Sequence, residues 1–137
     1  MNTFKLKVVA SDKVFFDGEC KSLVIPVAQE GLCGFLANHC NTVAPIEFGE
    51  MKIVDAEDNS IEVFVGSGFL EFLNNEASVV CISVERPEEI DARRAEEAKQ
   101  RAEEKLLYEQ SIYEQYETQA NLSRAMERLK VKNRHEI

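Results

Sequence analysis

The sequence lacks any apolar run of the roughly 20 residues that a helix needs to cross a bilayer. No charged segment followed by an apolar one precedes the first predicted strand, so we expect no secretory leader. We therefore expect the protein to reach a membrane only through partners. Basic residues are also few, 16 against 25 acidic ones, and the pI is about 4.8. A chain this acidic repels phosphate backbones, which argues against a nucleic-acid-binding protein.

The chain has only four cysteines, Cys20, Cys33, Cys40 and Cys81. Their spacing fits no zinc or redox pattern, so we predict reduced, half-buried thiols and no metal site. His39 stands beside Cys40, which suggests a thiol hydrolase that uses Cys40 or Cys33 as an alternative function. Neighbouring strand residues point to opposite faces, so the adjacency argues against a direct pair, and we expect His39 to be a loop or packing residue.

Glycine and proline are absent after Pro87, and this absence divides the chain. All six glycines and all eight phenylalanines precede residue 88, whereas all three tyrosines follow it. Pro87 is followed by acidic residues and then by a segment rich in Ala, Arg, Lys and Glu. A proline and carboxylates favour the first turn of a helix. We predict a β-sandwich docking domain at residues 1–86 and a helical regulatory arm at residues 87–137.

The first 86 residues predict short strands separated by turns. Alternation of polar and apolar residues predicts a strand over residues 3–9. Asp17-Gly18 predicts a hairpin turn, and residues 31–35 predict a glycine-kinked loop. Further strands are expected over residues 42–48, 49–54, 61–65, 69–73 and 77–84, with turns at residues 58–60 and 74–75. This pattern is typical of an antiparallel sandwich or flattened barrel.

From residue 88 onwards the apolar period changes from two to about 3.6. Ala95, Ala98, Ala102 and Leu106 fall on one face, a narrow stripe that permits close helix packing. Two antiparallel helices joined near Ser111 are the first interpretation, and one long helix is the alternative. An alanine stripe buries little apolar area, so a hairpin would be only marginally stable alone. The predicted fold class is α+β, an N-terminal antiparallel β-sandwich or flattened barrel followed by a two-helix hairpin.

Arginines recur at helical spacing in the second half of the chain. Arg94 and Arg101 share one face of the first predicted helix, and Arg124 and Arg128 share one face of the second. An antiparallel hairpin can bring these four guanidiniums together, and clustered guanidiniums favour a polyphosphate ligand. The plain alternative is that the arginines are solvated or paired with glutamates, and that Asp91 is only a first-turn carboxylate.

Four segments together resemble the epsilon-subunit family of bacterial F-type ATP synthases, over nearly the whole chain. The β half has Gly31-Leu32-Cys33-Gly34-Phe35-Leu36-Ala37-Asn38-His39 and Val65-Gly66-Ser67-Gly68-Phe69-Leu70-Glu71. The helical half has Ile90-Asp91-Ala92-Arg93-Arg94-Ala95 and Ser123-Arg124-Ala125-Met126-Glu127-Arg128-Leu129. Each motif is weak by itself, but their order, spacing and placement make the set specific.

The resemblance implies a non-catalytic rotor subunit on the cytoplasmic face of the bacterial cell membrane. In that family the sandwich binds the gamma subunit and rests on the ring of c subunits. The helical pair either folds onto the sandwich or extends along gamma toward the alpha and beta subunits, where it inhibits ATP hydrolysis. No cofactor is implied, but relatives with the Ile/Leu-Asp-x-x-Arg-Ala motif can bind ATP on the folded hairpin as a regulatory ligand.

The ATP-binding residues that the resemblance implies here are Glu85, Ile90, Asp91, Arg94, Ala95, Arg101, Arg124 and Arg128. Asp91 is expected to contact the adenine or ribose, and Ile90 to pack on the base. This chain departs from some ATP-binding relatives at Tyr116-Glu117-Thr118, where they have a basic residue, and Glu117 is expected to oppose phosphate binding. The alternative function is a sandwich adaptor with a helical interaction arm and no nucleotide site, on which ATP has no effect.

Overall fold

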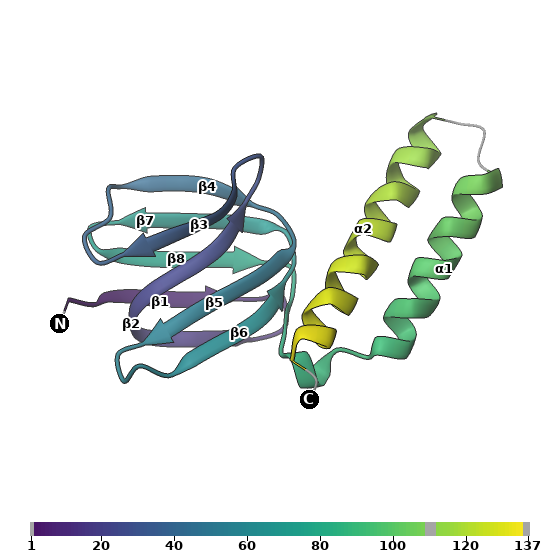
Figure 1. The fold of residues 1–137 in the computed structure, drawn as a ribbon. Helices are drawn as coiled ribbons and strands as arrows, with labels where there is room; N and C mark the ends of the chain where they lie inside the picture. The colour runs from purple at the N-terminus through teal and green to yellow at the C-terminus, as the bar shows by residue number, and fades with distance from the viewer. Residues whose placement is uncertain (1, 109–111, 136–137) are drawn as a thin grey trace. The chain divides into compact units, whose positions relative to one another are not determined.

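A computed structural model describes residues 2–108 and 112–135, and the side chains of all of these except residues 108 and 112–116. The chain divides into two compact units, Met1–Arg86 and Pro87–Ile137. In the part of the chain described, the first unit contains nine strands and the second contains two α-helices (Figure 1). The predicted α+β fold class is therefore confirmed. No helix within these residues is long and apolar enough to span a membrane.

The strands of the first unit belong to one hydrogen-bonded sheet that folds back on itself. The strands are β1 (Phe4–Val9), β2 (Val14–Val27), β3 (Gly31–Leu36), β4 (Thr42–Ile46), β5 (Gly49–Asp55), β6 (Ser60–Val65), β7 (Gly68–Leu73), β8 (Glu76–Cys81) and β9 (Val84–Glu85). Their order is β1-β8-β7-β4-β2-β5-β6-β9, and β3 pairs with β2. An additional pairing of β1 with β2 closes the circuit β1-β8-β7-β4-β2, which makes the unit a flattened barrel. Only the β1–β8 pairing is parallel among the strands described.

The hairpin turn predicted at Asp17-Gly18 is not formed, because the two segments expected to flank it are one continuous strand, β2. Asp17 and Gly18 lie inside β2, opposite Lys7 and Leu6 of β1, so the turn predicted there is wrong. The turn between β1 and β2 spans residues 10–13 and is closed by a hydrogen bond from the N–H of residue 10 to the carbonyl of residue 13 (2.9 Å). An Asp-Gly pair makes a hairpin turn when its residues take positive φ. Neither Asp17 nor Gly18 has positive φ, and the ladder runs through both.

Residues 31–35 form a strand instead of the predicted loop. β3 pairs along its whole length with β2. Gly31 begins the strand with φ of 80°, in the left-handed region that favours glycine, whereas Gly34 lies in the extended ladder. Because the strand alternates, Phe35 is buried, whereas Leu32 and Leu36 on the opposite face are exposed.

The other predicted turns lie where the sequence indicates, with one strand divided. Asn74 and Asn75 have φ of 51° and 62° in the β7–β8 turn, and Asp58 has φ of 66° in the β5–β6 turn. The strand expected over residues 77–84 is split into β8 and β9. It breaks because Ile82 and Ser83 bond instead to residues 66–67, through Gly66 N–Ser83 O (2.9 Å) and Ile82 N–Ser67 O (3.0 Å).

The core of the first unit consists of large apolar side chains from both layers. Its largest fully buried members include Phe4, Phe72, Leu6, Leu23, Ile25, Met51, Ile53 and Leu70. Each such side chain contributes about 1.5–3 kcal/mol through its removal from water. Burial also raises the pKa of the Cys20 thiol to about 12 and that of the Cys81 thiol to about 11, so both are inert, neutral packing groups.

The second unit is a helical hairpin. A 3₁₀ turn η1 (Pro87–Glu89) precedes α1 (Ala92–Tyr108) and α2 (Ile112–Arg134), which pack side by side in opposite directions (Figure 1). Lys132 Nζ donates to the carbonyl of Pro87 (3.2 Å), which ties the end of α2 to the beginning of the unit. The two-helix interpretation is therefore confirmed, and Ser111, near which the helices were expected to join, lies outside the described residues.

Gly68 provides a direct test of the β7–β8 packing. A Cβ atom there would lie 1.9 Å from the Val80 carbonyl oxygen, so the two strands would have to separate. We expect Gly68→Ala to lower the free energy of unfolding by about 3 kcal/mol or to prevent folding. Gly34→Ala is the matched control, because a Cβ atom at Gly34 meets nothing within 4 Å. Denaturant unfolding of both variants, followed by circular dichroism, would contradict this packing if their midpoints were equal.

Candidate functional site

A groove of about 300 Å³ lies between the two helices. Its lining residues are Ala98, Arg101, Ala102 and Lys105 from α1 and Thr118, Asn121, Arg124, Ala125 and Arg128 from α2. Ala102 and Ala125 are buried, and their small side chains permit the close approach of the helices. Arg101 and Lys105 are exposed, so a ligand can reach them from solvent. The alanine stripe expected from the sequence is thus part of the groove as well as of the packing.

The groove is basic. Four cations line it, and there is no carboxylate among the described residues of its lining. Arg101 and Lys105 are one turn apart on α1, as are Arg124 and Arg128 on α2. Like charges at this spacing repel by about 0.2–0.5 kcal/mol per pair, so the arrangement favours an anionic ligand. Guanidinium groups suit phosphate in particular because their N–H donors match its oxygens in pairs.

Three of the eight ATP-binding residues implied by the sequence meet in this groove: Arg101, Arg124 and Arg128. Arg94 is exposed near the start of α1, two turns before Arg101, and is not among the lining side chains. Of the four arginines expected to cluster, three line this groove, and Lys105 lines it as well. Ala98, which belongs to the alanine stripe predicted for the first helix, also lines the groove.

Asp91 caps α1. Its Oδ1 accepts a hydrogen bond from the Arg94 N–H (3.1 Å), and its carbonyl accepts one from the Ala95 N–H (3.0 Å). An aspartate in this position satisfies an otherwise unpaired donor at the helix start and stabilises the helix by about 0.5–2 kcal/mol. Ile90 and Ala95 on either side of it are buried. The Asp91 carboxylate thus stabilises the start of α1, the structural role that the sequence analysis kept as an alternative to ATP binding.

Glu85 lies in the other unit from the remaining seven residues. It is the last residue of β9, half-buried and opposite Phe64 of β6. Arg86, which ends the unit, holds its guanidinium carbon 4.9 Å above the ring centre of Phe15, a cation–π contact that fixes the chain where it leaves the sandwich.

Three groove residues were not predicted from the sequence: Lys105, Thr118 and Asn121. Lys105 follows Arg101 by four residues, and Arg128 follows Arg124 by the same spacing. The sequence therefore did indicate that Lys105 lies on the same helix face as Arg101. Thr118 is only 2% exposed. Glu117, expected to oppose phosphate binding, is exposed and is not among the described side chains that line the groove.

His39 and Cys40 are closer together than the strand argument predicts. Residues 37–41 form a loop, and His39 Nδ1 lies 3.8 Å from Cys40 Sγ. The same Nδ1 lies 2.8 Å from the Cys40 carbonyl oxygen, which can only accept, so Nδ1 bears the proton and cannot act as a base toward the thiol. The His39 ring packs 4.6 Å from Phe35, as expected for a packing residue.

Cys33 is also a poor nucleophile. Burial, followed by the nearby carboxylate of Glu30, raises the pKa of the Cys33 thiol and disfavours the reactive thiolate. Its Sγ lies 3.7 Å from Glu30 Oε2. The geometry of Cys33 and Cys40 therefore does not favour the hydrolase hypothesis.

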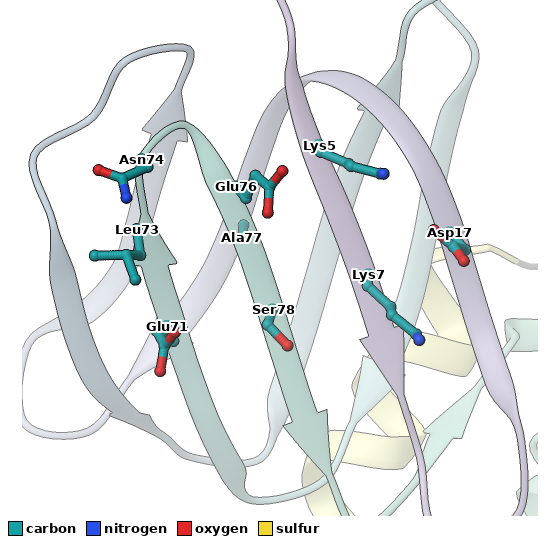
Figure 2. A pocket seen from close by; sticks show the side chains of 9 residues that line it. All are labelled: Lys5, Lys7, Asp17, Glu71, Leu73, Asn74, Glu76, Ala77 and Ser78. Carbon is teal, nitrogen blue, oxygen red and sulfur yellow. The ribbon is translucent and has the colours of Figure 1, made fainter.

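A second hollow, of about 570 Å³, lies on the outer face of the first unit (Figure 2). Figure 2 shows Lys5 and Lys7 on β1, between Asp17 of β2 and the side chains of β8 and β7. Its lining combines these two lysines with the carboxylates of Asp17, Glu71 and Glu76. Mixed charge of this kind does not favour a phosphate ligand, in contrast to the groove between the helices.

Beside this hollow, one row of residues is apolar across five strands. The row runs in register from β2 to β4 through Val14, Val9, Val80, Phe69 and Pro45. Val14 and Val80 are each 56% exposed, and Phe69 is 63% exposed. On one side the row is bordered by Lys7, Asp17 and Glu71. Exposed apolar residues in a continuous row are typical of a protein–protein contact surface. We call these five residues the apolar row.

Comparison with known proteins assigns the two units separately. Residues 3–87 match the family described as ATP synthase, Delta/Epsilon chain, beta-sandwich domain. Residues 88–133 match the family described as ATP synthase, Delta/Epsilon chain, long alpha-helix domain. The two matches meet within two residues of the boundary between the compact units, between Arg86 and Pro87.

Curated relatives match over nearly the whole chain. The ATP synthase epsilon chain of Ruminiclostridium cellulolyticum is 38% identical over 134 residues, which cover 98% of each chain. That of Caldicellulosiruptor bescii is 38% identical over 143 residues, which cover all of both chains. That of Lacticaseibacillus casei is 34% identical over 139 residues, covering 98% of this chain and 96% of the relative.

Solved structures with lower identity share the fold. A chain of the Euglena gracilis mitochondrial ATP synthase (OSCP/F1/c-ring) superposes with a TM-score of 0.81 at 17% identity, covering 92% of this chain and 79% of the other. A chain of the Tetrahymena thermophila mitochondrial ATP synthase (central stalk/c-ring) superposes with a TM-score of 0.69 at 12% identity, covering 93% and 95%. Since both family matches and the identity to the bacterial relatives extend over almost the full length, this chain belongs to the ATP synthase delta/epsilon chain family.

Proposed function

We propose that this chain is the epsilon subunit of the central stalk of an F-type ATP synthase, a rotor component without catalytic residues of its own. The sandwich docks permanently on the gamma subunit and the c ring. It thereby holds the protein peripherally at the cytoplasmic face of the bacterial cell membrane. The helical hairpin is a conditional element that restrains ATP hydrolysis. Membership of the delta/epsilon family supports the rotor role, and the apolar row supports docking.

The apolar row is the observation that favours a permanent docking surface. Four of its members are exposed and Val9 is half-buried, although residues next to them on the same strands, such as Val8, Val79 and Leu70, are buried in the core. Removal of such surface from water contributes about 25 cal/mol per Å², so a partner that covers it gains affinity. We assign the row to the gamma subunit because an apolar surface suits a partner that stays bound.

The groove between the helices supports regulation by ATP. Its cations come from both helices, so a phosphate chain bound there holds α1 and α2 together. A ligand shifts a conformational equilibrium only by its differential affinity for the two states. Extension of the arm toward the alpha and beta subunits separates the helices and removes the site. ATP therefore favours the folded hairpin, with a coupling of about 1–3 kcal/mol.

Docking is tested by placing a charge in the apolar row. Phe69→Glu is expected to weaken binding to the gamma subunit at least about tenfold, because a carboxylate would be desolvated in the interface. Leu36→Glu is the matched control: Leu36 is also 63% exposed but lies on β3, away from the row. Surface plasmon resonance with immobilised gamma subunit measures the affinity of each variant. Equal affinities for the two variants would reject the row as the gamma-binding surface.

Restraint of hydrolysis is tested by removing the arm. The end of α2 is basic, with Arg124, Arg128, Lys130, Lys132 and Arg134 against one glutamate, and so suits acidic surfaces of the catalytic head. Deletion of residues 88–137 is expected to raise the ATP hydrolysis rate of the reconstituted complex at low ATP. The arm has no such role if the truncated and full-length complexes hydrolyse ATP at the same rate.

ATP binding is tested with the isolated full chain by titration calorimetry. Arg101→Ala, Arg124→Ala and Arg128→Ala are each expected to weaken ATP binding at least about tenfold, since each removes a charge-assisted contact to phosphate. ADP, with one phosphate fewer, is expected to bind more weakly than ATP. Arg93→Ala is the control, because the Arg93 side chain is 87% exposed and pairs with Glu97 at 3.2 Å.

Two outcomes would overturn the nucleotide proposal. Equal losses in the Arg93 and Arg101 variants would indicate general charge attraction instead of a site. No binding by the wild-type chain at millimolar ATP would favour the alternative of an adaptor with a helical interaction arm and no nucleotide site.

A further inference from the structure

One side chain joins the two ends of the helical unit. Lys132, in the last turn of α2, donates from Nζ to the carbonyl of Pro87, the first residue of the unit (3.2 Å). The same carbonyl accepts the Ile90 N–H (3.2 Å), which closes the 3₁₀ turn η1. The Lys132 carbonyl in turn accepts the His135 N–H (3.2 Å) where α2 ends. Lys132 therefore links the end of α2 to the turn that precedes α1.

The Lys132–Pro87 contact lies where the unit is packed. Ile90 and Val131 are only 4% and 1% exposed, and Lys132 itself is half-buried. α2 also contacts η1 directly. A hydrogen bond with a charged donor is about twice as strong as a neutral one, and it is strengthened further where water is partly excluded. The contact therefore differs from a fully solvated surface pair, which contributes little to stability.

The seam between the helices supplies little apolar area to hold them together. Among the described residues of α1 the buried side chains are those of Ala95 and Ala102, and on α2 the largest buried apolar ones are those of Leu122 and Val131. Apolar burial stabilises in proportion to the area removed from water. In a hairpin with so small a seam, one charged hydrogen bond between its two ends is a substantial part of what keeps α2 beside α1.

The contact also requires the hairpin to be closed. The chain runs along α1, which is about 25 Å long, before it returns along α2 to Lys132. Lys132 Nζ therefore reaches the Pro87 carbonyl only while α2 lies antiparallel to α1. An arm with its helices extended end to end would separate the two groups by more than the length of either helix.

We propose that this hydrogen bond is a latch that holds the hairpin closed, so that the arm extends only after Lys132 has left the Pro87 carbonyl. The latch sets the population of the extended arm in the absence of any ligand. This inference rests on the extension of the arm in the proposed function, and it assigns the control of that extension to residues outside the groove.

Amide hydrogen exchange of the full chain without nucleotide tests the latch. Lys132→Met removes the donor and keeps an apolar stem. Opening of the hairpin exposes the amides of both helices, so this variant is expected to speed exchange at least about threefold around Ala102 and Ala125 as well as in the last turn of α2. Lys132→Arg retains a charged donor and is expected to restore most of the protection.

Lys130→Met is the matched control, because Lys130 has the same charge and lies two residues away on α2 but is exposed. It is expected to leave exchange around Ala102 and Ala125 unchanged. Faster exchange of Lys132→Met confined to residues 129–135 would indicate local fraying of the helix end and overturn the latch. Equal effects of Lys132→Met and Lys130→Met would also overturn it.

A double-mutant cycle assigns the effect to the Pro87 carbonyl, since an ammonium has three donors. Replacing the amide between Pro87 and Glu88 by an ester, through protein ligation, weakens this carbonyl as an acceptor and leaves every side chain unchanged. The ester also weakens the Ile90 bond in both backgrounds, so the difference between backgrounds measures the latch. The ester is expected to speed exchange more in the wild-type background than in Lys132→Met. Equal effects in both would overturn the assignment to Pro87.

ATP hydrolysis by the reconstituted complex separates this inference from the proposed function. The ester variant is used because it retains every charge that the arm offers to the catalytic head. It is expected to lower the hydrolysis rate at low ATP at least about twofold, because more of the arm is extended. The wild-type complex and the complex without residues 88–137 are measured beside it.

Each result decides one of the two claims. If exchange responds as expected but neither the ester nor the truncation changes hydrolysis, restraint by the arm fails and the latch stands as a property of the chain. If truncation raises hydrolysis but Lys132→Met and the ester leave exchange unchanged, the proposed function stands and the latch fails. If truncation raises hydrolysis and exchange responds, an unchanged rate with the ester overturns the link between the latch and extension.

Discussion

The close packing of α1 on α2 through alanine is the interaction on which the proposed regulatory site depends. Ala102 and Ala125 are buried where the helices meet, and side chains of this size let two helix backbones approach. The same approach brings two pairs of like charges to one groove, which opposes the packing. Because such a seam buries little apolar area, we expect the hairpin to be only marginally stable alone. An anion that neutralises the groove can then decide between folded and extended states.

The two units differ in the amount of apolar packing that stabilises them. The sandwich buries a continuous core that includes Phe4, Phe72 and Met51, and its turns are fixed by positive-φ asparagines such as Asn74 and Asn75. Among its described residues the helical unit buries fewer and smaller apolar side chains, chiefly alanines with Ile90, Leu122 and Val131, and it also has the Asp91 cap and the Lys132–Pro87 hydrogen bond. Elements that rearrange are drawn from the less stable parts of a protein. This difference supports the proposal of a permanent docking domain and a conditional arm.

Most of the fold could be predicted from the sequence because the spacing of apolar residues and the preferences of turn residues depend on near neighbours in the chain. The alternation of β1, the asparagine turn before β8 and the change of period after Pro87 all depend on near neighbours. Asp17-Gly18 was predicted wrongly because β1 pairs across it, and a tertiary ladder overrides a local turn preference. The loop predicted at residues 31–35 was wrong for the same reason, since pairing with β2 holds Gly34 extended.

The candidate site could be predicted only in part. Helical spacing named Arg101, Arg124 and Arg128, which line one groove, but it did not contain the register of α1 against α2, and so it did not show that Lys105 lines the groove or that Arg94 does not. That register depends on packing between the helices, which a single helix period does not contain.

Amide hydrogen exchange of the full chain, with and without ATP, tests the central claim that one anion holds both helices together. The account predicts that ATP slows exchange in α1 and α2 simultaneously, most around residues 101–105 and 121–128, while β1–β9 exchange at unchanged rates. Slowing confined to one helix, or an equal change in the sandwich, would contradict it.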